Sequence, residues 1–136
     1  MLKKVVIFVL LAVTCAAFSK SASTAPQFTS NKKPIYVRQG QTFNITLQSN
    51  PTTGFSWKWK STAYDRNLVS LVNQKYVAAT DKKLVGAPGY EVWTFRANKT
   101  ETGRYRVVQV GHIVMDYERP WEKNSALRKT FVVRIK

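Results

Sequence analysis

Short segments of alternating hydrophobic and polar residues follow one another through most of this chain. From 42 to 49, for example, Phe43, Ile45 and Leu47 occupy every second position, and polar residues lie between them. Because successive side chains of a β-strand point to opposite faces, this alternation predicts a strand with one buried face. No segment has a helical period longer than about two turns. The sequence therefore predicts an all-β sandwich, with further strands at 35–38, 55–60, 68–78, 90–97, 104–117 and 129–135.

Two of these predicted strands carry further detail. In 55–60, the side chains of Phe55, Trp57 and Trp59 share one face, which we expect to belong to the core. The strand 104–117 contains Gly111. We expect this glycine to mark a β-bulge, because a glycine inside a strand often does.

The N-terminal part has a different pattern. Lys3 and Lys4 precede an apolar run of nine residues, 5–13, and small residues follow, an order typical of a secretory signal peptide. The run is far shorter than the ~20 residues that a membrane-spanning helix needs. The mature chain would then have no membrane segment, and would be secreted or held in lysosomal or phagosomal vesicles. We expect a signal peptide at 1–17 (with cleavage as late as 23 as the alternative), a flexible lead-in at 18–33 and one β-sandwich domain at 34–136.

The residues that commonly carry catalysis are scarce. Cys15 is the only cysteine and lies in the predicted signal peptide, so the mature chain would have neither a disulfide nor a thiol nucleophile. His112 is the only histidine, which excludes the usual multi-histidine zinc sites, and its place in an apolar strand predicts a structural role. The sequence also lacks a nucleophile-elbow motif. We therefore expect no enzymatic activity, no metal and no cofactor.

Charge is the strongest signal in the composition. The chain has 22 Lys and Arg against 7 Asp and Glu, a net charge of +15. Without Lys3 and Lys4, 20 basic and 7 acidic residues remain, so the mature chain would carry +13. Such a surface attracts acidic partners. The sequence has no run of five or more like charges, which would indicate a tail that binds nucleic acid. We expect no nucleic acid as partner. A secreted, basic, immunoglobulin-like module that binds anionic glycans or cell surfaces stays as the second hypothesis.

Two sequons are present, one beginning at Asn44 and one at Asn98. Asn44 is expected on the outward face of its strand, and Asn98 in a turn. Both are candidate N-glycosylation sites in a eukaryotic secretory pathway.

The segment 50–55, called loop 1 below, differs from an ordinary connection between strands. Its proline fixes its own φ and disfavours a helical conformation at the residue before it, and its two threonines are stiff at χ1. The glycine permits a turn or a close backbone approach. The segment therefore predicts a rigid projecting loop, with a well-made turn that has no binding role as the simpler alternative. Loop 1 consists of Asn50, Pro51, Thr52, Thr53, Gly54 and Phe55.

Two later segments are also unusual. The segment 86–89 (loop 2) has two glycines around a proline. Its backbone is not shielded by large side chains, so it can lie close against another surface. The segment 119–121 (loop 3) places a tryptophan at a predicted loop, either as an exposed anchor for binding or folded back onto the edge of the sandwich. If the chain reverses at every connection, the three loops lie at one end of the sandwich, as is common for binding sites. Loop 2 consists of Gly86, Ala87, Pro88 and Gly89, and loop 3 of Arg119, Pro120 and Trp121.

The three motifs NPTTGF, GAPG and RPW, in this order within one β domain, resemble those of the chagasin-type inhibitors of cysteine peptidases. The resemblance extends from about Gly40 to Lys136. It implies an immunoglobulin-like sandwich whose three loops enter the active-site cleft of a papain-like, cathepsin-like cysteine peptidase. It also implies reversible, tight, 1:1 inhibition by a monomer.

The resemblance also implies a role for each loop. Thr53 and Gly54 would lie over the catalytic cysteine and histidine of the target, and loop 2 would follow the non-primed side of the cleft. Arg119 and Trp121 would contact the primed side. This sequence departs from the family pattern in two places: Pro88 stands where the family usually has glycine, and the strand 104–117 is several residues longer.

Overall fold

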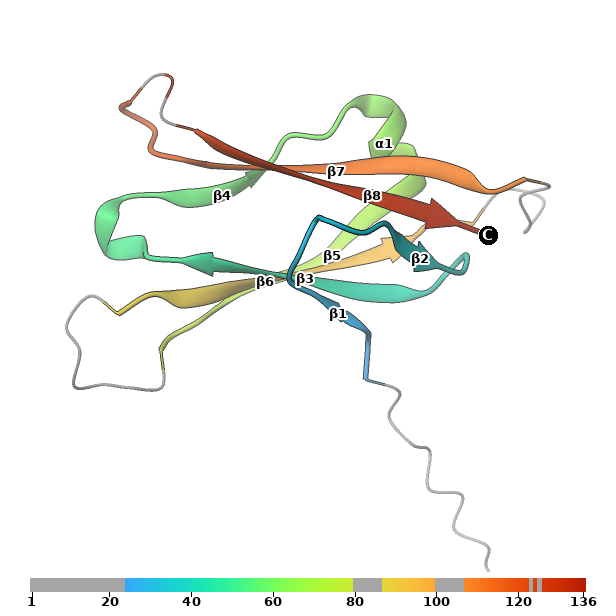
Figure 1. Cartoon of the computed structure of the whole chain (residues 1–136), viewed down its shortest axis with the longest axis horizontal. Coiled ribbons are helices and arrows are strands. Elements are labelled where there is room, and N and C mark those ends of the chain that lie inside the picture. Colours follow the sequence, from blue (N-terminus) through green and yellow to red (C-terminus); the bar gives the residue numbers. More distant parts are fainter. Residues whose placement is uncertain (1–23, 80–86, 100–106, 123, 125) are drawn as a thin grey trace, which may run out of the picture.

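The computed structural model describes residues 24–79, 87–99, 107–122, 124 and 126–136. In this part the chain forms two stacked β-sheets, with a short helix at their margin (Figure 1). The predicted signal peptide and the residues Gly86, Thr100 and 104–106 lie outside the described residues.

Within the described residues, each sheet has four strands. In sheet A the order is β1-β3-β6-β5, and in sheet B it is β2-β8-β7-β4. Neighbouring strands are antiparallel except at one edge of each sheet, where β1 pairs with β3 and β2 with β8 in parallel. The strands are β1 (Gln27–Phe28), β2 (Ile35–Val37), β3 (Thr42–Ser49), β4 (Ser56–Trp59), β5 (Val69–Val77), β6 (Gly89–Ala97), β7 (Gln109–Glu118) and β8 (Leu127–Ile135).

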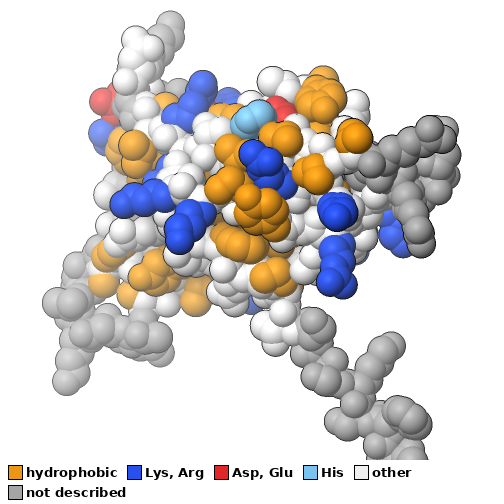
Figure 2. Space-filling model, turned by 45° about the vertical axis from the view of Figure 1, so that its right-hand side comes forward, with side chains coloured by type: hydrophobic (Ala, Val, Ile, Leu, Met, Phe, Trp, Pro, Cys, Tyr) orange, Lys and Arg blue, Asp and Glu red, His pale blue; other side chains and the backbone are white. Residues whose placement is uncertain are grey.

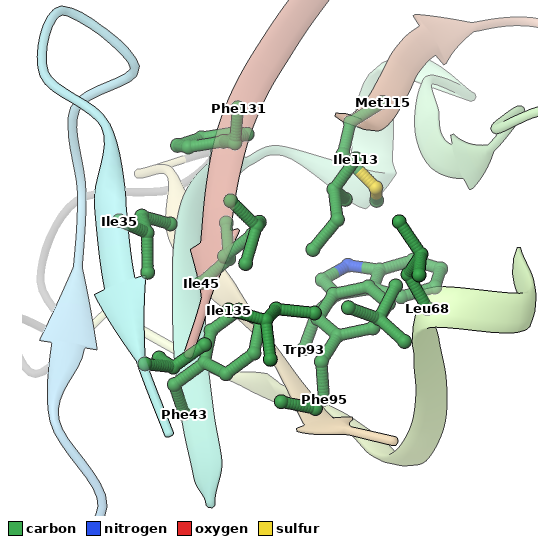
Figure 3. Close-up of a cluster of buried hydrophobic side chains, with 14 of the residues drawn as sticks. Ile35, Phe43, Ile45, Leu68, Trp93, Phe95, Ile113, Met115, Phe131 and Ile135 are labelled. Carbon is green, nitrogen blue, oxygen red and sulfur yellow. The ribbon is translucent and has the colours of Figure 1, made fainter. Parts of the chain in front are cut away.

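The core lies between the two sheets and is built from the inward positions of the alternating segments (Figure 3). Phe43 and Phe95 from sheet A stack with ring centroids 6.0 Å apart, and both are fully buried. Ile113 and Phe131 from sheet B are also fully buried. Burying large side chains of this kind stabilises the fold by about 1.5–3 kcal/mol each, and no disulfide contributes.

The predicted all-β sandwich is confirmed. β3 has the predicted bounds, and five further predicted strands lie within three residues of the observed ones at each end. Besides the short 3₁₀ helix η1 (Pro51–Thr53), two elements were not predicted. β1 lies in the segment expected to be a flexible lead-in, where Gln27 and Phe28 pair with Asn44 and Ile45. The helix α1 (Ala63–Leu68) is too short for its period to be read from the sequence.

α1 is held against β7 by a buried carboxylate. Asp65 is 5% exposed and accepts hydrogen bonds from the Thr62 hydroxyl (2.8 Å) and the His112 backbone N–H (2.8 Å). The His112 ring lies beside the same carboxylate, with 3.5 Å between Nδ1 and Oδ1. These contacts agree with the structural role expected for His112. Within the described residues, no helix could span a membrane and no cluster of acidic, histidine or cysteine side chains could hold a metal.

The expectation of a bulge at Gly111 is wrong. β7 and β8 pair in continuous register from Gln109↔Ile135 to Tyr117↔Leu127, and Gly111 faces Val133. The glycine instead leaves room for α1, because a Cβ at this position would lie 3.1 Å from Cδ1 of Leu68.

Candidate functional site

Loops 1 and 3 and the described part of loop 2 lie at the same end of the sandwich. Loop 1 joins β3 to β4, loop 3 lies between β7 and β8, and loop 2 leads into β6. The ends of these strands that adjoin the loops lie together on the left of Figure 1, opposite the C-terminus. The arrangement follows from the reversal of the chain at each connection, as predicted.

Loop 1 is closed by its own hydrogen bonds around the short 3₁₀ helix η1 (Pro51–Thr53). Asn50 is extended (φ −126°, ψ 91°), as expected before a proline. Its carbonyl accepts from the Thr53 backbone N–H (3.2 Å) and hydroxyl (2.7 Å), while the Thr52 hydroxyl donates to its side-chain oxygen (2.6 Å). Gly54 ends the turn in the left-handed conformation, at φ 79°. The loop is therefore well ordered while Pro51, Thr52 and Thr53 remain exposed.

A tyrosine of β7 fixes the base of loop 1. The Asn50 backbone N–H donates to the hydroxyl of Tyr117 at 2.9 Å. The Tyr117 ring lies between the rings of Phe55 and Trp57, with centroid distances of 5.1 and 4.9 Å. Trp57 in turn donates from its indole to the carbonyl of Gln48 (2.9 Å). Both ends of loop 1 are thus tied to the strand that leads into loop 3.

Loop 3 extends the same aromatic stack. The guanidinium of Arg119 lies over the Phe55 ring, 4.4 Å from its centroid, and its Nε lies 2.6 Å from the Glu122 carboxylate in an ionic contact. The Nε–H is not aligned for a hydrogen bond. The Arg119 side chain is 32% exposed, so much of it already has partners within the protein. Its position predicts that it holds loop 3 against loop 1.

Trp121 is exposed, yet it touches loop 1. Its relative exposure is 70%, so it is not a core residue. Its indole lies against the backbone of Gly54: a Cβ at position 54 would fall 2.8 Å from Cζ2 and 3.3 Å from Cζ3 of the ring. Gly54 therefore has two reasons to be glycine, its positive φ and the ring beside it.

The base of loop 3 is closed by an ion pair between its two strands. Arg128 of β8 donates two hydrogen bonds to the buried Asp116 of β7, at 2.8 and 2.9 Å. These bonds hold the pKa of the Asp116 carboxyl below its ordinary value of 3.8, although burial acts in the opposite direction. The same pairing raises the pKa of Arg128.

Loop 2 is described from Ala87 onward. Gly89 begins β6 opposite Ser49, and a side chain there would collide with the Val77 carbonyl and with Tyr76, 2.7 Å from its Cζ. Pro88 borders a hollow of about 220 Å³ between the base of loop 1 and β8. Pro88 thus closes one side of this hollow.

A buried polar group lies behind loops 1 and 2. Glu91 is 6% exposed, and its carboxylate accepts from the Ser49 hydroxyl and from the Trp93 indole, both at 3.0 Å. The sequence reasoning missed both Glu91 and Tyr117. A glutamate at an inward position of the alternation was the available signal for Glu91, whereas nothing local marked Tyr117.

The fold and these loops define a class: an immunoglobulin-like sandwich that presents a preformed set of binding loops at one end. Residues 36–135 match the family described as Chagasin family peptidase inhibitor I42. The chain belongs to this family. Its members are peptidase inhibitors and not enzymes, which confirms the expectation from the sequence.

Individual relatives agree with this assignment. The chain is 32% identical over 108 residues to Chagasin of Trypanosoma cruzi, covering 78% of this chain and 90% of the relative. It is 30% identical over 105 residues to Amoebiasin-1 of Entamoeba histolytica, covering 77% and 90%. The crystal structure of the cysteine protease inhibitor EhICP2 from Entamoeba histolytica has the same fold, with a TM-score of 0.63 at 21% identity and coverage of 82% and 96%.

Proposed function

We propose that the protein is a reversible, tight-binding inhibitor of papain-like cysteine peptidases, and that its three loops occlude the active-site cleft of the target in a 1:1 complex. Family membership supports the class of target. The observation that carries the mode of action is the preassembly of loops 1 and 3, in which Gly54 lies against Trp121 and Phe55 against Arg119. Rigid loops lose little entropy on docking, so more of the contact energy is retained as affinity.

Occlusion without cleavage follows from the closure of loop 1. A substrate must present its scissile carbonyl to the thiolate at attack distance. In loop 1 the carbonyls of Asn50 and Pro51 already accept hydrogen bonds within the loop, from Thr53 and Gly54. We infer that Thr53 and Gly54 fill the space over the catalytic residues while the loop resists the extended conformation of a substrate.

The other two loops would contact the cleft on either side. Loop 2 would follow the non-primed side through its backbone, with Pro88 contributing shape and no N–H donor. Trp121, exposed and rigid, would be the main anchor on the primed side. Arg119 would act chiefly within the inhibitor, by holding loop 3 in place. An interface of ~1,600 Å² with such an anchor would give nanomolar affinity.

We also infer that the chain enters the secretory pathway and loses residues 1–17, or as many as 23. The mature inhibitor would then meet its target outside the cell or in lysosomal or phagosomal vesicles. N-terminal sequencing of the secreted protein tests this point.

Titration of the mature protein against a papain-type peptidase tests the function. We expect stoichiometric loss of activity, recovery on dilution, and an uncut inhibitor by mass spectrometry after long incubation. The variant Thr53→Arg should lose inhibition, because the side chain would collide with the catalytic centre. Its melting temperature should fall only slightly, because the position is exposed and the change removes the Thr53 hydroxyl bond to Asn50 within the loop.

Gln74→Arg is the matched control: it adds the same charge at an exposed position in the middle of β5. It should inhibit like the unmodified protein. A stoichiometric cut between Thr52 and Phe55, or full inhibition by Thr53→Arg, would contradict the proposal.

A further inference from the structure

The outer face of sheet B carries most of the basic side chains that the two sheets present to solvent. The strand alternation and the pairing register place three of them on this face, on β4 and β8, and three more directly follow β2, β4 and β8 at positions where the alternation continues. Figure 2 shows Lys and Arg side chains around a group of hydrophobic side chains on the face that carries the histidine. The six residues are Arg38, Lys58, Lys60, Arg128, Arg134 and Lys136.

The acidic side chains do not balance this charge. Among the described residues, the carboxylates of Asp65, Glu91 and Asp116 are buried. The two that remain at the surface are in ion pairs, Glu118 with Lys60 (3.4 Å) and Glu122 with Arg119 (2.6 Å). On the outer face of sheet B, Asp116 pairs with Arg128 and Glu118 with Lys60, so the six basic and two acidic residues leave four positive charges without a carboxylate to balance them.

Sheet A differs sharply. Its outer face carries the neutral Asn44, with its side chain bonded to the Thr94 hydroxyl, and other uncharged polar side chains. Its basic residues in the described strands are Arg96 on β6 and Lys75 on the edge strand β5. The asymmetry is not a consequence of net charge, because both sheets belong to the same basic chain.

The dimensions of the basic face suit a linear polyanion. Arg128 and Arg134 lie on one face of β8 six residues apart, about 20 Å at ~3.3 Å per residue. Lys58 lies two strands from Arg128, about 10 Å away at ~4.8 Å per strand.

Single-stranded nucleic acid generally requires several aromatic stacking surfaces, and the exposed aromatic side chain in these rows is Tyr36. A lipid surface would favour large protruding apolar groups, whereas Val110, Val114 and Val132 are short.

We propose that the outer face of sheet B is a binding site for a linear sulfated polysaccharide, separate from the inhibitory loops. Sheet B forms one side of the sandwich, whereas loops 1 and 3 lie at its end (Figure 1). A bound polysaccharide would leave loops 1 and 3 accessible. The protein could then be retained on an anionic matrix and still inhibit its target.

Chromatography on immobilised heparin tests the site with two matched double variants. Lys58→Glu with Arg134→Glu changes the charge of sheet B by four units, and Lys75→Glu with Arg96→Glu changes sheet A by the same amount. We expect the sheet B variant to elute at clearly lower salt than the sheet A variant. In solution, its log–log salt slope for heparin binding should fall by about 1.5, since two ionic contacts are lost.

A sulfonate cation-exchange column is the control for charge alone, and there the two variants should elute together. Equal elution from heparin would overturn the proposal, because binding would then follow net charge and not the face. Peptidase inhibition is measured on the same proteins. The sheet B variant should inhibit normally, and heparin should not relieve inhibition by the unmodified protein. Loss of inhibition in the sheet B variant would contradict the separation of the two sites.

Discussion

The indole of Trp121 lies against the α-carbon of Gly54, and this contact joins the third loop to the first. The two residues are 67 positions apart in the sequence, yet the gap between them would not admit a methyl group. Gly54 is also at φ 79°, which L-residues with a side chain rarely adopt. The absence of a side chain at Gly54 thus allows Trp121 to take its position beside loop 1.

Gly54→Ala should displace Trp121 and strain the backbone at once. We expect inhibition to weaken ~10- to 100-fold, with a loss of about 1–2 kcal/mol in unfolding free energy from the left-handed conformation. Inhibition constants and chemical denaturation measure the two effects.

Gly40→Ala separates the two causes, because Gly40 has nearly the same φ, 78°, and its nearest neighbour is the flexible end of Lys99. It should lose similar stability and inhibit normally. Equal loss of inhibition in both variants would mean that the contact with Trp121 has no special part.

Trp121→Ala should separate binding from folding. Because Trp121 is 70% exposed, we expect little change in melting temperature and a loss of ~2–4 kcal/mol in binding, about 30- to 1,000-fold in the inhibition constant. Trp57→Ala is the comparison: Trp57 is 3% exposed, and its truncation should cost ~3–5 kcal/mol of stability. Unfolding of Trp121→Ala, or unchanged inhibition, would remove loop 3 from the proposed mechanism.

Tyr117→Phe should loosen loop 1 without disturbing its aromatic neighbours. The variant keeps the stack with Phe55 and Trp57 but loses the acceptor for the Asn50 N–H, so we expect about 1 kcal/mol less stability. We also expect weaker inhibition with a faster dissociation rate, because the free loop becomes more mobile. Tyr36→Phe removes an exposed hydroxyl far from the loops. It should alter neither the stability of the fold nor the dissociation rate of the complex. Normal inhibition by Tyr117→Phe would show that the remaining bonds suffice to order loop 1.

Asp116 should make stability depend on pH in the acid range. Its pKa is lower in the folded protein than the ordinary 3.8, so its ion pair with Arg128 stabilises the fold fully above about pH 5, and this contribution is lost as the pH falls through the folded pKa. Asp116→Asn should therefore lower the melting temperature at pH 7. The difference in melting temperature between this variant and the unmodified protein should shrink at and below pH 3. A constant difference between pH 7 and pH 3 would mean that the ion pair between Asp116 and Arg128 does not cause the pH dependence.

Local patterns predicted most strands well because strands such as β3 and β6 have one exposed or half-buried face and one buried face. The alternation around Phe43 and Ile45 gave β3 its bounds, and the reversal of the chain placed the loops at one end. β1 and α1 were missed because two and six residues are too few to show a period. Gly111 was misread because its role depends on Leu68, which is distant in the sequence. The links from Tyr117 to Asn50 and from Trp121 to Gly54 likewise exist only once the sheets are assembled.

The stack of Arg119, Phe55 and Tyr117 has a consequence for protein engineering. A substitution in loop 1 alters the surface that Arg119 and Trp121 of loop 3 contact, so the two loops cannot be optimised one at a time. Retargeting this scaffold to another peptidase would require transplanting loops 1 and 3 together with Tyr117 as one cassette. Loop 2 adjoins the same region, because Pro88 lines a hollow that Tyr117 and Asn50 also line, so a library that varies loop 2 should keep this proline.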